Sequence, residues 1–177
     1  MTGHTLDQLL NGTILPAFKR MAYEGDLQYL AFGQISMGIE LFGACSDAEP
    51  DINKERLSRI RFNLGLTSYM AKVDVRYASY AGQRGEPFEL YGNLRCGMAH
   101  LLRPKSELGL TSRAGAANDG TKHLEVYAPL NKLVLVAEQW FDDFESAAKL
   151  FIADLPSMDQ TKVGGVFLPV HDIAAAT

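Results

Sequence analysis

Apolar residues recur every three or four positions along most of this chain, and this spacing restricts its fold more than any other feature. Residues 5–22 show it clearly, with Leu6, Leu10, Ile14 and Phe18 in one series. Such spacing places apolar side chains on one face of an α-helix. It predicts helices over 5–22, 26–45, 54–80, 88–103 and 138–155, with a kink or restart at Pro16 and an N-cap at Asp26.

The pattern changes between residues 107 and 136. ELGLTS and TKHLEVY alternate between apolar and polar residues, and RAGAANDG between them ends in an Asn-Asp-Gly turn signal. We therefore expect a β-hairpin over 107–127, with KLVLV (132–136) as a third strand. The predicted fold is mainly α, a four- to five-helix bundle with a small antiparallel β-hairpin insertion before the last long helix.

A single domain over 1–177 is the expected organisation, with the insertion at about 107–136 and a short tail over 156–177. Within the tail, VGGVFLPV favours an extended segment. Hydrophobic content of 47% and charged content of 21% are typical of globular domains.

No stretch approaches the roughly 20 lipophilic residues of a membrane span, and MTGHTLDQLLNGT lacks the order of a secretory signal. Cys45 and Cys96 lie in apolar helical patterns, as free thiols do in a reducing compartment. We expect a cytoplasmic protein that does not interact with membranes.

Charge is distributed unevenly along the chain. Residues 54–113 contain eleven Lys or Arg against five acids, a net charge of +6. The remainder contains six against sixteen, a net charge of −10. This asymmetry indicates either a face for a polyanion or charges that compensate each other in the fold.

The stretch FELYGNLRCGMAHLLR places Arg95 and His100 within an otherwise apolar helical pattern. Arginine is a permanent cation, and histidine exchanges a proton near neutral pH. A regular helix directs side chains five residues apart about 140° away from each other. The pair therefore either fixes the helix end to neighbouring segments, or acts at one atom through a distorted helix end or with residues from a second chain.

The order of helices, with RCGMAH (95–100) in the penultimate one and a predicted hairpin after it, resembles the HEPN superfamily and its R-x4-6-H signature. The resemblance covers about residues 5–155. It implies an α-helical bundle, RNA engagement and, in many members, metal-independent endoribonuclease activity that leaves a 2′,3′-cyclic phosphate. It also implies a homodimer with its site at the interface and a neutralising protein partner.

If the resemblance holds, Arg95 stabilises the scissile phosphate and His100 acts as general acid or base. Asn93, Arg103 and Lys105 are the candidate RNA-binding residues, although Arg103 and Lys105 could instead interact with the helix dipole. Cys96 departs from the family pattern, because active members most often carry a polar residue, commonly asparagine, after the arginine. We expect no cofactor and no metal, because Cys96 and His100 lack the further ligands that a zinc site needs.

Two other hypotheses remain open at this stage. A non-catalytic HEPN-like module could dimerise and bind a protein partner or a small ligand. A helical bundle could also hold an apolar ligand between its second and third helices, where Gly33, Gly38 and Gly43 allow close approach.

Overall fold

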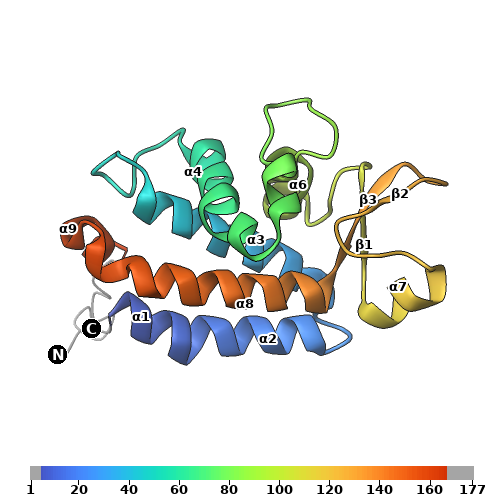
Figure 1. Ribbon diagram of the computed structural model, residues 1–177, viewed down its shortest axis with the longest axis horizontal. Helices are drawn as coiled ribbons and strands as arrows, with labels where there is room; N and C mark the ends of the chain where they lie inside the picture. Colours follow the sequence, from blue (N-terminus) through green and yellow to red (C-terminus); the bar gives the residue numbers. More distant parts are fainter. Residues whose placement is uncertain (1–4, 167–177) are drawn as a thin grey trace, which may run out of the picture.

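The computed structural model describes residues 5–166, which form a mainly helical fold with a small three-stranded sheet at one end (Figure 1). The predicted fold class is therefore confirmed. The α-helices are α1 (Leu6–Leu9), α2 (Leu15–Tyr23), α3 (Gln28–Ser46), α4 (Ser58–Gly65), α5 (Ala71–Val73), α6 (Cys96–Leu101), α7 (Arg113–Asp119), α8 (Ala137–Asp154) and α9 (Gln160–Gly164). The strands are β1 (Leu108–Thr111), β2 (Val126–Tyr127) and β3 (Lys132–Val136).

Three π-helical segments, Leu10–Ile14, Leu66–Met70 and Tyr91–Arg95, each lead directly into an α-helix. The first lies just before Pro16, whose missing N–H cannot bond to the preceding turn, and α2 restarts there as expected. Two 3₁₀ segments, Val75–Tyr80 and Leu155–Ser157, complete the helical elements in the described residues. The second predicted helix begins at Gln28, with Leu27 rather than Asp26 at its N-cap.

Two predicted helices are shorter than expected. The helix predicted over 54–80 begins at Ser58 and ends at Val73, where Asp74 adopts an extended backbone and accepts a hydrogen bond from the Arg76 amide at 2.9 Å. The helix predicted over 88–103 spans 91–101. It ends at Leu102, which has a left-handed backbone with φ of 51°.

The predicted hairpin over 107–127 is wrong. Its turn forms α7 instead, with the Ser112 hydroxyl accepting from the Gly115 amide at 3.1 Å and Gly120 ending the helix at φ of 64°. β1 pairs with β3 in parallel and β2 pairs with β3 in antiparallel, in the order β1-β3-β2. KLVLV is the central strand. Ser112 as the N-cap and Gly120 as the C-cap of α7 outweighed the turn signal.

The predicted extended segment VGGVFLPV is tested only in part. Val163 and Gly164 end α9, while residues 167–170 lie outside the described range.

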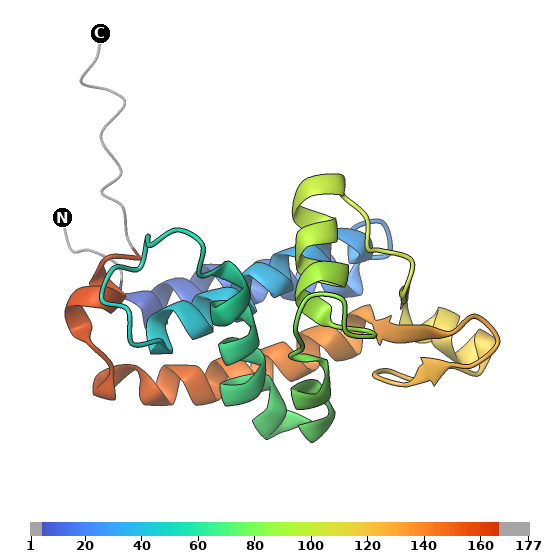
Figure 2. The same cartoon turned by 90° about the horizontal axis from the view of Figure 1, so that it is seen from above.

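A cluster of aromatic rings forms the centre of the helical core. Phe42 of α3 stacks on Phe144 and Phe151 of α8, with ring centroids 5.1 and 4.5 Å apart. In Figure 1, α8 lies along α1 and α2, and α3 runs behind it; Figure 2 shows α4 and α6 beside each other across these long helices.

Helices α3 and α4 approach closely because both carry glycine at their contact. A Cβ atom on Gly43 would collide with the carbonyl of Arg61, and one on Gly65 would collide with the carbonyl of Ile39. This contact fixes α4 and therefore the two arginines on it, Arg59 and Arg61.

Candidate nucleic-acid interface

Arg95 is the last residue of the π-helical segment before α6, and it is held by an acid. Its Nε donates to Glu40 Oε2 on α3 at 2.6 Å, and the two side chains are 20% and 18% exposed. The Ser58 hydroxyl donates to the other oxygen of Glu40 at 2.6 Å. Arg95 thus connects α6 to α3 and, through Glu40, to α4. Among the described residues, no other guanidinium N–H of Arg95 forms a hydrogen bond, so most of these donors are free.

His100 lies exposed in the last turn of α6. Within residues 5–166 its side chain forms no hydrogen bond or ion pair, either with Arg95 or with any other residue. Because Cys96–Leu101 is a regular α-helix, the two side chains diverge as the spacing predicts. One chain therefore does not bring Arg95 and His100 together.

Asn93 is buried, with 6% of its surface exposed. Its side-chain amide donates to Glu107 Oε2 at 3.1 Å, and its backbone carbonyl accepts from the Lys105 backbone amide at 2.9 Å. These contacts hold the chain that follows α6 against the helix. A nucleic acid on the surface would not reach the Asn93 side chain.

Arg103 and Lys105 are both exposed in the loop after α6. The Arg103 amide donates to the Gly97 carbonyl at 3.3 Å, and a side chain at Gly97 would collide with the Arg103 carbonyl. The loop therefore turns back closely over α6. Lys105 lines a hollow on the surface, whereas Arg103 does not.

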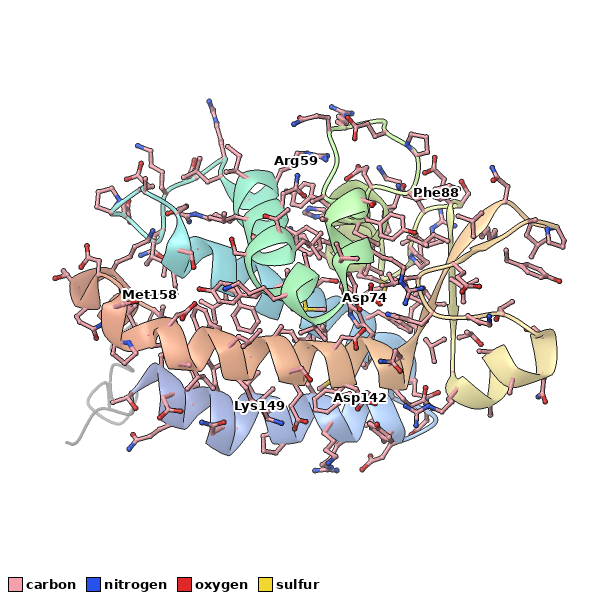
Figure 3. The ribbon with its side chains drawn as sticks, viewed as in Figure 1. Arg59, Asp74, Phe88, Asp142, Lys149 and Met158 are labelled. Carbon is pink, nitrogen blue, oxygen red and sulfur yellow. The ribbon has the colours of Figure 1, made fainter. Side chains whose placement is uncertain are left out.

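This hollow has a volume of about 440 Å³ and is lined by four cationic side chains, Arg56, Arg59, Arg84 and Lys105. We call it the basic hollow. Its cations come from the turn before α4, from the start of α4, from the loop over 81–90 and from the loop after α6. Figure 3 places Arg59 between α4 and the segment that carries α6. Four cations against the one buried carboxylate that pairs with Arg59 give the hollow a net charge of +3.

The eleven cations of residues 54–113 differ in their partners. Six contact an acid: Arg59, Arg61, Lys72, Arg76, Arg95 and Arg113. In the part of the chain that the structure describes, five have no acid within 4 Å: Lys54, Arg56, Arg84, Arg103 and Lys105. Three of these five line the basic hollow. Acidic partners thus neutralise six of the eleven cations in the fold. Three of the remaining five gather in the basic hollow.

Arg59 is held in the hollow by its neighbours. Its Nη1 donates to Glu89 Oε2 at 2.9 Å, and its Cζ lies 4.5 Å from the centroid of the Tyr91 ring. Glu89 is 3% exposed and also accepts from the Gly92 amide at 2.8 Å. A Cβ atom on Gly92 would collide with the Glu89 carboxylate, so a larger residue there would displace the partner of Arg59.

Tyr91 and Cys96 complete the wall of the hollow near Ser58. Burial raises the pKa of Tyr91; the nearby Ser58 hydroxyl lowers it and Cys96 raises it. The phenol therefore stays protonated at neutral pH and keeps a hydrogen to donate. Its ring already contacts Arg59, and Phe62 lies 5.8 Å away, which leaves little of it for stacking on a base.

Other kinds of site are not supported by the described residues. Between residues 5 and 166, no group of three or more His, Cys, Asp or Glu side chains could hold a metal ion. Over the same range, none of the helices combines the length and apolar character that crossing a bilayer requires.

Of the residues that line the basic hollow, sequence reasoning singled out Lys105 as a binding residue but missed Arg56, Arg59, Arg84 and Tyr91. The positive charge of residues 54–113 indicated the three arginines only as part of a count, and no sequence signal indicated Tyr91.

Comparisons with protein-family models, with curated proteins and with solved structures found no match. The resemblance to HEPN domains therefore depends on the sequence features given above.

Proposed function

We propose that this protein binds RNA as a HEPN-like domain and that the basic hollow makes its first contacts with the RNA phosphates. The observation that carries the proposal is the gathering of three cations without acidic partners, Arg56, Arg84 and Lys105, in one hollow. Neutralising phosphates releases counterions from RNA, which makes such a cluster favourable for binding. We propose RNA rather than DNA because RCGMAH (95–100) resembles the signature of the HEPN superfamily.

The contacts around Tyr91 favour recognition of phosphate rather than of base. Aromatic platforms that stack bases need a free ring face. Tyr91 instead supports Arg59, whose guanidinium offers a planar fork of donors to phosphate oxygens. Binding is therefore expected to be independent of sequence and to weaken steeply with salt.

A salt titration of binding to labelled single-stranded RNA tests this function. Arg84→Ala should weaken binding and reduce the slope of log affinity against log salt by about 0.7 for each phosphate that the protein no longer neutralises. The matched control is Arg20→Ala, which removes another exposed arginine, one that lies on α2 and pairs with Glu24. Absence of binding at low salt, or equal losses in the two variants, would contradict the proposal.

RNA cleavage is a second candidate function, favoured by the exposure of His100 without a partner in residues 5–166. His100 would act as general acid or base and Arg95 would bind the phosphate through donors that Glu40 leaves free. Incubation with RNA in EDTA should give products with a 2′,3′-cyclic phosphate, and His100→Ala should abolish them. Equal cleavage by both proteins would remove this assignment and leave the non-catalytic binding module.

Cleavage also requires a homodimer, because one chain does not bring Arg95 and His100 together. The surface beside His100 suits a protein contact: Leu101 and Leu102 are 60% and 69% exposed, and Leu102 borders a groove with Leu30 and Met37. A neutralising protein would compete for the same surface.

The dimer can be tested by light scattering on Leu102→Asn. Asparagine tolerates the left-handed backbone at this position, so the fold should be retained while the exposed apolar side chain is removed. The matched control is Leu130→Asn, because Leu130 is equally exposed in the turn after β2. A wild-type protein that is monomeric at micromolar concentration would contradict the dimer.

A further inference from the structure

The cations of the basic hollow are grouped compactly, although they are far apart in the sequence. Arg56 belongs to the turn before α4, Arg59 to the start of α4, Arg84 to the loop over 81–90, and Lys105 to the loop after α6. All four border the same volume of about 440 Å³. A protein that follows a nucleic-acid strand needs cations spaced along a track. Cations that surround one hollow instead fit a single concentrated charge.

The charge of the hollow exceeds that of one internal phosphate. Its four cations and the buried carboxylate of Glu89 leave a net charge of +3. A phosphodiester carries one negative charge, whereas a phosphomonoester carries about 1.5 to 2 at neutral pH. Coulomb attraction is proportional to charge, so a monoester gains more from the same cations.

The start of α4 adds to this preference. Ser58 and Arg59, which line the hollow, are the first two residues of α4, and no side chain caps this end of the helix. The first amides of a helix have no partner within it and carry partial positive charge, so they favour an anion. Within the hollow, this end reinforces the four cationic side chains.

We propose that the basic hollow binds the terminal phosphomonoester of an RNA strand. The inference rests on the proposed function and narrows it from phosphates in general to the strand end. The chemistry is shared by a 5′-phosphate and a 3′-phosphate. Arg59, held by Glu89, provides a fixed guanidinium, and Arg56, Arg84 and Lys105 close around the remaining oxygens.

Three RNA strands of one sequence, with an internal fluorophore, test this proposal at physiological salt. The first has hydroxyls at both ends, the second a 5′-phosphate and the third a 3′-phosphate. We expect one phosphorylated strand to bind about tenfold more tightly than the strand without phosphates, which identifies the end. The advantage should shrink below about pH 6, where the monoester takes up a proton.

Variants attribute the preference to the hollow. Arg84→Ala with Lys105→Ala should remove the difference between the strands, whereas Arg20→Ala with Lys149→Ala should preserve it. All four residues are exposed, so the folds should be retained, and thermal unfolding checks this. Equal binding of all three strands would overturn the terminal-phosphate site and leave RNA binding intact. No binding of any strand would overturn RNA binding itself.

Discussion

Helix α4 supplies one arginine to each of two positive clusters that differ in every other respect. Arg61 lies in a buried cluster with Asp47 and Lys162, in which the side chains are between 3% and 9% exposed. Arg59, two residues earlier and therefore on the other side of the helix, lines the basic hollow. Comparing the two separates charges that hold the fold together from charges that are available to a ligand.

In the buried cluster, all three guanidinium nitrogens of Arg61 donate to the protein. Nε donates to Asp47 Oδ2 at 2.6 Å, while Nη1 and Nη2 donate to the carbonyls of Ile52 at 2.5 Å and Asp51 at 2.9 Å. Lys162 donates to the Asp47 carboxylate and to its carbonyl. This cluster fastens α9 and the loop after α3 to α4. Burial raises the pKa of Asp47, but the hydrogen bonds from Lys162 and Arg61 outweigh this and leave it below its usual value.

In the basic hollow, by contrast, only Arg59 has an acidic partner among the described residues. The difference shows that burial of polar groups demands partners, while exposed cations can remain without them. Pairing, rather than charge alone, therefore identifies the cations that bind a ligand.

The largest effect is expected from Asp47→Asn, which leaves two buried cations without their counterion. Removing one partner of a buried ion pair costs about 3–5 kcal/mol in the free energy of unfolding. Urea unfolding measures this loss, and RNA affinity of the folded protein should not change. Glu145→Gln is the control, because its pair with Lys149 is exposed and contributes at most about 1 kcal/mol. Equal losses would show that the buried cluster is not structural.

A smaller effect is expected at a second buried cluster, where the Tyr77 hydroxyl donates to Asp143 Oδ2 at 2.7 Å and lies 2.9 Å from His123 Nε2. The Val136 amide donates to His123 Nδ1 at 2.9 Å, so this nitrogen carries no hydrogen. Burial and, to a lesser extent, the charge of Arg76 lower the pKa of His123 to about 3, although Asp74 opposes this shift.

The unfolded chain therefore takes up a proton on His123 below about pH 6.5, which the folded protein does not. The stability that neutral His123 provides is fully present above pH 6.5 and is lost as the pH falls toward 3. Between pH 6.5 and 5 the free energy of unfolding should fall by about 2 kcal/mol. Urea unfolding across this range should show a smaller fall in His123→Gln. Asp143 is present in both proteins, so their difference isolates His123, and identical curves would contradict a neutral buried histidine.

An effect on stability of similar size is expected from Glu89→Gln, which should also raise RNA affinity. Loss of the charged bond to Arg59 should cost about 1–3 kcal/mol in the free energy of unfolding. Removal of the carboxylate that pairs with Arg59 in the hollow should raise RNA affinity a few-fold at low salt. Glu86→Gln is the control, because Glu86 is exposed on the same loop and pairs with no cation in residues 5–166. A loss of affinity in Glu89→Gln would show that Arg59 acts in RNA binding only when Glu89 holds it.

The sequence was sufficient to predict α3, α8 and the strand β3. Each carries a clear apolar pattern, and the apolar residues of that pattern are buried in the core. It could not predict the end of the third helix at Val73, which depends on the extended backbone of Asp74. It also could not decide between a turn and a helix at 113–119. Gly120 fits both the Asn-Asp-Gly turn and the end of a helix, and Ser112 fits a helix N-cap.

The same limit applies to the site. Arg56 and Arg84 were visible only as part of a charge count, and nothing in the sequence linked them to Lys105, because tertiary structure brings residues 28 and 21 positions apart to one hollow. The partners of Arg95 and Asn93 were equally hidden, since Glu40 is 55 residues and Glu107 is 14 residues away. Spacing within one helix predicted the divergence of Arg95 and His100, which involves no other element.

RNA binding by two triple variants of equal net charge tests the central claim most directly. One replaces Arg56, Arg84 and Lys105 of the basic hollow with alanine. The other replaces Arg20, Lys122 and Lys149, which are exposed and paired with Glu24, Glu125 and Glu145. We predict that the first variant loses RNA affinity by at least about tenfold at 0.15 M salt and that the second binds within about twofold of wild type. Equal loss in both variants would contradict the account, because net charge rather than the unpaired cations of the hollow would then determine binding.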